Sequence, residues 1–202
     1  MDAITILKIL AIIIFIVVII LRSLGPTKNR KAIDDSIHLL SEQFPARKPE
    51  YIPDPGIFDA FKEDCTNPAL LTSLAYGILM HCGMKPENLS VVTKTDMGLR
   101  RAAGTYSSNG HNSLITIQIT PSSRANIIFS VLIHECMHYF LFHSGIRYED
   151  TYKNEILTDT ATVYMGFYKY MYDGYIMVGY LRESELKYVD EKLSHTASPQ
   201  AR

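Results

Sequence analysis

Residues 127–142 combine an almost unbroken apolar sequence with the polar pentapeptide HECMH at residues 134–138. Apolar residues on nearly every side predict a helix that is buried rather than amphipathic. The two histidines, four residues apart, lie one turn apart on the same helix face. Because each unpartnered buried polar group costs roughly 2–7 kcal/mol, this helix needs a compensating partner. A metal ion shared by both imidazoles is the simplest such partner.

The HECMH pentapeptide is typical of a catalytic zinc site. His134 and His138 supply two nitrogen ligands, and Glu135 can take a proton from a metal-bound water. The alternative is a pair of core histidines bonded to backbone carbonyls. A chance HExxH match in this chain has a probability on the order of one percent, which favours the zinc site.

A catalytic zinc needs a third protein ligand and leaves its fourth position to water or substrate. Glu155 and Asp159, in the segment NEILTD, share one face of a second predicted helix. Glu155 can complete a His-His-Glu set, and Asp159 can accept the free ring N–H of a ligating histidine. The alternative third ligand is His143, which lies about 140° around the helix from His138. A role at the helix C-terminus suits His143 better.

HECMH followed by NEILTD resembles the gluzincin arrangement of thermolysin-like metallopeptidases, with HExxH on one helix and NExxxD on the next. The resemblance spans roughly residues 123–166, and its interval of about 16 residues between His138 and Glu155 is shorter than in thermolysin. It implies three zinc ligands: His134, His138 and Glu155. It also implies Glu135 as the general base and Asp159 as a partner of His134. The alternative for NEILTD is an exposed acidic first turn favoured by the helix dipole.

Residues 4–21 form an apolar run that predicts a transmembrane helix at the short end of the spanning range. Lys8 interrupts the run and can snorkel near a helix end. A cleaved signal peptide is the alternative, but Asp2 precedes the run and no A-x-A-like site follows it. By the positive-inside rule, the basic residues after the span place the C-terminal domain on the cytoplasmic side. These residues are Arg22, Lys28, Arg30 and Lys31.

The chain of 202 residues is long enough for one domain, and its net charge of −1 gives no electrostatic signature of a nucleic-acid-binding protein. Its three cysteines have no paired spacing, which fits a reducing compartment: Cys65, Cys82 and Cys136. The zinc-site resemblance and the apolar run at residues 4–21 give the expected partners, which are a peptide or protein substrate and the lipid bilayer.

The chain divides into six predicted segments. They are an N-terminal tail (1–3), the transmembrane helix (4–21), a basic juxtamembrane helix (22–44), a proline-rich linker (45–56), a zinc metallopeptidase domain (57–194) and a flexible tail (195–202). Within the domain, helices are expected near 58–64, 67–82 and 184–193, and strands at 89–95, 103–108 and 114–120. Asn109-Gly110 predicts a hairpin between the last two strands. The fold class is therefore α+β: a small zincin-like domain with a short antiparallel sheet, an HExxH helix and a second ligand helix.

These features predict a membrane-anchored zinc metallopeptidase in which Glu135 takes a proton from water and hands it to the leaving amine. The strand at 114–120 or its hairpin partner can pair with an extended substrate, although an ordinary interior hairpin is equally consistent with the pattern. The alternative function is a non-catalytic, membrane-tethered zinc-binding or interaction domain, closed by a fourth ligand such as His143 or Cys136. A tyrosine-rich run could stabilise the tetrahedral intermediate or fill the core. It comprises Tyr164, Tyr168, Tyr170, Tyr172, Tyr175 and Tyr180.

Overall fold

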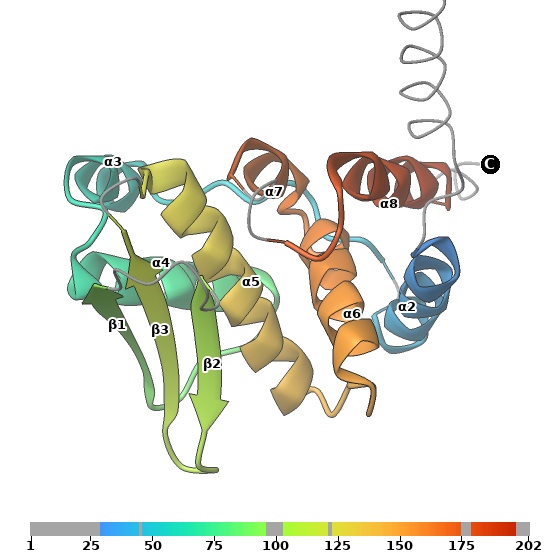
Figure 1. Cartoon of the computed structure of the whole chain (residues 1–202), viewed down its shortest axis with the longest axis horizontal. Coiled ribbons are helices and arrows are strands. Elements are labelled where there is room, and N and C mark those ends of the chain that lie inside the picture. The colour runs from blue at the N-terminus through green and yellow to red at the C-terminus, as the bar shows by residue number, and fades with distance from the viewer. Residues whose placement is uncertain (1–28, 45, 96–102, 121–122, 175–178, 197–202) are drawn as a thin grey trace, which may run out of the picture.

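A computed structural model describes residues 29–44, 46–95, 103–120, 123–174 and 179–196 of the chain (Figure 1). Seven helices and three strands lie in these residues. In chain order they are α2 (Arg30–Gln43), α3 (Pro55–Glu63), α4 (Pro68–His81), β1 (Leu89–Thr95), β2 (Gly104–Ser108), β3 (Ser113–Ile119), α5 (Ala125–His143), α6 (Thr151–Tyr164), α7 (Tyr168–Gly174) and α8 (Glu183–Thr196). The predicted α+β class is confirmed. The predicted transmembrane helix at 4–21 lies outside the described residues.

Short polar side chains set where three of the helices begin. Asp54 accepts a hydrogen bond from the backbone N–H of Ile57 at the start of α3, and Asn67 caps α4 in the same way. Asp150 accepts from Lys153 N–H at the start of α6. Such caps satisfy backbone donors that have no partner inside the helix. In α6, this start places the NEILTD segment in the first turns of the helix.

The three strands form one mixed sheet with the order β1-β3-β2. β2 and β3 are antiparallel and joined across Asn109-Gly110, as predicted, but β1 pairs with β3 in parallel. The expectation of a purely antiparallel sheet is therefore wrong. β3 carries Ile115 and Ile117, which are fully or almost fully buried, and it takes the central position where both of its edges are paired. β2 is left as an edge strand.

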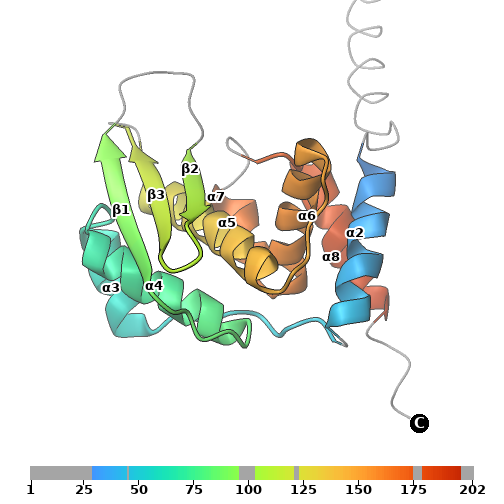
Figure 2. The ribbon, with the colours of Figure 1, turned by 90° about the horizontal axis from the view of Figure 1, so that it is seen from below.

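α5 is the central helix of the molecule. It packs against β2 and β3 on one side and against α6 and α7 on the other, while α4 packs against β1 (Figure 2). Thirteen of its 19 residues are buried, which confirms the predicted buried helix. Within the described part of the chain, α5 is also the one helix long and apolar enough to cross a membrane. Its burial among the other elements accounts for that composition.

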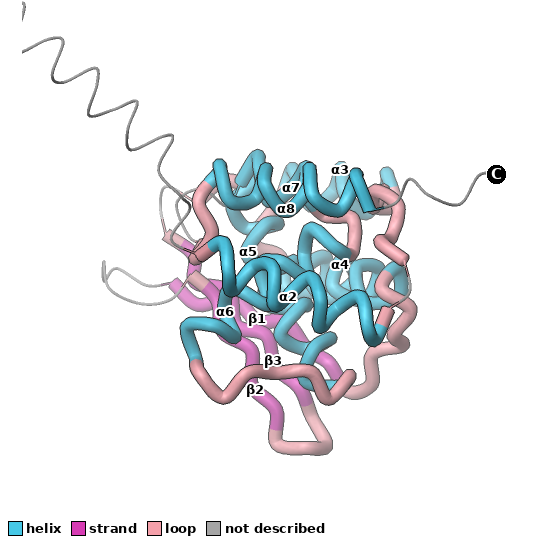
Figure 3. The backbone as a smooth tube through the Cα atoms, turned by 90° about the vertical axis from the view of Figure 1, so that its right-hand side faces the viewer, coloured by secondary structure: helices cyan, strands magenta, loops and turns pink. Residues whose placement is uncertain are grey.

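α2 belongs to the same folded unit as the elements that follow it. It lies over α6, with α8 beside it (Figure 3). Its residues Ile33 and Leu40 are fully buried, and Tyr51, in the segment leading to α3, joins the same core. α6 therefore covers the apolar face of this helix. At the other end, α8 continues to Thr196.

The segment before α3 is held against the end of α6 at Gly166. The Gly166 carbonyl accepts the backbone N–H of Tyr51 at 3.0 Å, and Gly166 itself has a φ of +88°. A Cβ at this position would lie 2.0 Å from the carbonyl oxygen of Pro49, a contact that no side chain can make without moving the backbone.

We predict that Gly166→Ala lowers the free energy of unfolding by about 3 kcal/mol, from left-handed backbone strain and the clash together. Gly110→Ala is the matched control, because Gly110 has a φ of +86° but no atom within 4 Å of the point where a Cβ would lie. It should cost only about 1 kcal/mol. Denaturant unfolding of both variants measures the difference, and equal losses would contradict the packing argument.

Candidate metal centre

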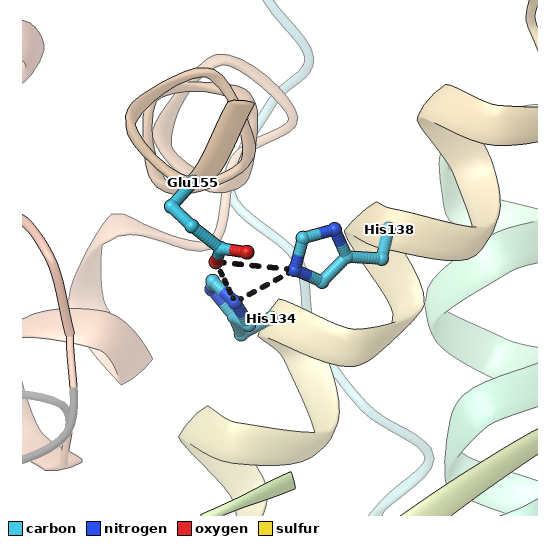
Figure 4. A group of neighbouring side chains, drawn as sticks. All are labelled: His134, His138 and Glu155. Carbon is cyan, nitrogen blue, oxygen red and sulfur yellow. Dashed lines mark hydrogen bonds and ion pairs between the residues drawn. The ribbon is translucent and has the colours of Figure 1, made fainter. Parts of the chain in front are cut away.

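α5 and α6 bring the side chains of His134, His138 and Glu155 together (Figure 4). The two histidine Nε2 atoms lie 3.0 Å apart. The Glu155 Oε2 atom lies 3.2 Å from the His134 Nε2 atom and 3.3 Å from that of His138. This group of three side chains could hold one metal ion.

The spacing of the three donor atoms fits a tetrahedral ion. Donors about 2.0–2.1 Å from a tetrahedral zinc lie about 3.3–3.4 Å from one another, close to the distances in this site. All three side chains also line a cavity of about 530 Å³. A tetrahedral ion in this site would therefore keep its fourth position on the cavity side.

The other ring nitrogen of each histidine is fixed by a partner on α6. His134 Nδ1 lies 2.9 Å from Oδ1 of Asp159, which is fully buried, and donates its proton to that carboxylate. His138 Nδ1 lies 3.3 Å from the Thr158 hydroxyl oxygen. That hydroxyl donates its own proton to the carbonyl of Asn154 at 2.9 Å, so it accepts from His138. Both histidines therefore direct the Nε2 atom, the usual metal-binding nitrogen, into the site.

Two Nε2 atoms and a carboxylate oxygen that converge in this way need positive charge between them. Without a metal ion, protons on the histidines can provide this charge. Burial opposes the charged form of His134, but its hydrogen bonds to Asp159 and Glu155 outweigh burial and raise the pKa of the imidazole to about 10. Burial likewise favours neutral Glu155, but hydrogen bonds from His134 and His138 lower the pKa of its carboxyl to about 2. A metal ion would supply the same positive charge, so the donor set fits a cation.

Asp159 also fixes one wall of the cavity. Its second oxygen, Oδ2, accepts the backbone N–H groups of Tyr180 at 3.0 Å and Leu181 at 2.9 Å. Gly179 and Tyr180 line the same cavity as His134, His138 and Glu155. A single buried carboxylate therefore orients His134 and holds this wall in place.

Glu135 lies on the side of α5 that faces the edge strand β2. Its side chain is almost fully buried and lines the cavity beside the histidines. Burial raises the pKa of the Glu135 carboxyl, while the charges of His134 and His138 and a hydrogen bond from the Tyr106 backbone oppose the shift. A Cβ at Gly104 would lie only 2.7 Å from Glu135 Oε1, so glycine leaves the room that this carboxylate occupies.

The two side chains considered as other ligands lie away from this group. His143 stacks on Tyr139, with ring centroids 4.2 Å apart, and its Nε2 atom lies 3.5 Å from the Tyr106 hydroxyl. Cys136 is fully buried in the core. Of the tyrosine-rich run, Tyr180 lines the cavity among the residues that the structure describes.

Three residues of the site were not singled out from the sequence: Gly104, Tyr106 and Thr158. A glycine inside a strand pattern signals close approach of another group to the backbone, so Gly104 carried a usable signal. Thr158 carried none, because its role depends on how α6 packs against α5.

When the chain is compared with protein-family models, with curated proteins and with solved structures, no significant match is found.

We predict that the purified chain binds one transition-metal ion, and that His138→Ala and Glu155→Ala each lose it because two donors hold an open site weakly. His143→Ala is the control and should retain the metal. Elemental analysis of the four proteins measures the metal content. Retention by Glu155→Ala together with loss by His143→Ala would show that the third ligand is wrong.

Metal binding should also release a proton at pH 7. His134 is protonated there when no metal is bound, because its pKa of about 10 lies above 7, and a ligating imidazole must be neutral. The affinity for the metal ion should therefore rise with pH, because fewer protons compete with the metal for the His134 nitrogen. Titration calorimetry in two buffers of different ionisation enthalpy measures the release, and identical heats in both would contradict it.

Proposed function

We propose that this chain is a zinc metallopeptidase of the gluzincin type, in which Glu135 is the general base. The observation that carries the proposal is the position of Glu135, a buried carboxylate in the same cavity as the His-His-Glu group. Two imidazoles and one carboxylate with an open position are typical of catalytic zinc. The same donor types also suit iron(II), which elemental analysis distinguishes from zinc.

Zinc bound to His134, His138 and Glu155 would supply Lewis acidity toward water and toward the substrate carbonyl. Glu135 would take the proton of the attacking water and return it to the leaving amine. Its raised pKa suits both steps, because a base must also become an acid within the same cycle. Tyr180 lines the cavity, and its hydroxyl is the candidate donor to the oxyanion.

The free edge of β2 supports a peptide as the substrate. Gln118 N–H donates to the Ala103 carbonyl, so in this antiparallel ladder the alternate residues Gly104 and Tyr106 turn their backbone groups away from β3. Both residues line the cavity. The Tyr106 N–H already donates to Glu135, so an extended chain could add to β2 through the backbone groups of Gly104 and the carbonyl of Tyr106, and pass beside Glu135.

The competing function is a metal-binding or interaction domain without catalysis. A structural zinc site is closed by a fourth protein ligand. In the described residues the metal-binding group has three members, and they open onto a cavity, which favours catalysis. We further propose that residues 4–21 anchor this domain at the cytoplasmic face of a membrane.

Glu135→Gln is expected to keep its metal but to lose about 100-fold or more in the rate of cleavage of an unstructured protein, because general base catalysis contributes about 10²–10⁴-fold. Glu191→Gln, on the exposed side of α8, is the control and should retain full activity. Full activity in Glu135→Gln would exclude Glu135 as the base. A metal-loaded wild type that cleaves no peptide would support the non-catalytic alternative.

A further inference from the structure

A second cavity, of about 210 Å³, adjoins the metal site on the side of His138. Three residues line both cavities: Tyr106, His138 and Asn154. We propose that this second cavity is a specificity subsite that binds an apolar side chain of the substrate. The proposal rests on the function proposed above and names the residue type that the enzyme would select.

The lining of the cavity is mainly apolar. Leu141 and Phe142 follow His138 by three and four residues on α5, which places them one turn along the helix from this ligand. Ile146 comes from the loop that follows the helix, and both Leu141 and Ile146 are buried. Phe142 is 50% exposed, and its ring lies 6.0 Å, between centroids, from that of Tyr106. Contact with an apolar group of a ligand would remove part of this exposed aromatic surface from water, which is energetically favourable.

The one charged residue in this lining is Arg147, which is exposed. No ion pair of Arg147 is found within the described residues. A guanidinium at this position disfavours a second positive charge in the cavity. The subsite should therefore accept leucine-like or phenylalanine-like side chains and reject lysine and arginine.

The spacing along β2 connects the subsite to the reacting bond. Gly104 contacts Glu135, and Tyr106, two residues further along the strand, lines the second cavity. Two strand residues span about 6.6 Å. An extended peptide paired with β2 and cleaved beside Glu135 would therefore place in the cavity a side chain within two residues of the cleaved bond.

Peptide hydroxamates test the subsite without requiring turnover. The zinc-loaded full chain is titrated with compounds that carry glycine, leucine or lysine at one or two residues from the chelating group. At one of these positions the leucine compound should bind about tenfold more tightly than the glycine compound, whereas lysine should bring no gain. Phe142→Ala should abolish the leucine preference. Met80→Ala, which removes another exposed apolar side chain on α4, should leave it unchanged.

Equal affinities for leucine and glycine, or a preference that survives Phe142→Ala, would overturn the subsite. Cleavage of a peptide mixture separates this inference from the proposed function. Glu135-dependent cleavage without an apolar preference at a fixed position would overturn the subsite and leave the peptidase standing. Leucine-selective binding by a chain that cleaves no peptide would support the subsite and contradict the peptidase.

Discussion

The hydrogen bond between His134 and Asp159 is the interaction on which the rest of the site depends. It joins α5 to α6 through a carboxylate that has no exposed surface. A buried carboxylate is costly unless all of its oxygens are paired, and here the second oxygen is paired with the backbone of Tyr180 and Leu181. Two helices and one loop therefore share a single polar anchor in an otherwise apolar interior. Replacement of Asp159 would disturb both the orientation of the His134 ring and the shape of the cavity.

The same core helix contributes to the packing of the core and carries most of the candidate site. α5 fills the space between the sheet and the other helices, and its polar residues point toward the few places where neighbouring elements leave room or offer a partner. β2 leaves room through Gly104, and α6 offers partners through Thr158 and Asp159. Rigid surroundings of this kind hold polar side chains in fixed positions.

Local patterns in the sequence predicted the bounds of most elements to within three residues, because capping, strand alternation and the Asn109-Gly110 turn act over a few residues. The order of the strands could not be predicted in this way, since the parallel pairing of β1 with β3 depends on contacts between distant segments. The same distinction holds for the site. The histidine spacing predicted a shared helix face, whereas the part played by Thr158 became visible only once the two helices were packed.

The neighbouring positions of α5 and α6 in the chain have a consequence for how the protein acquires its site. All three candidate metal ligands and both of their anchoring partners lie between residues 134 and 159, so they can assemble within one helical hairpin. The surroundings of Glu135 instead require the edge strand to dock from an earlier part of the chain. Contacts between close segments form at a lower entropic cost than contacts between distant ones. In a nascent or partly unfolded chain, the three candidate metal ligands could therefore come together before the sheet is in place around Glu135.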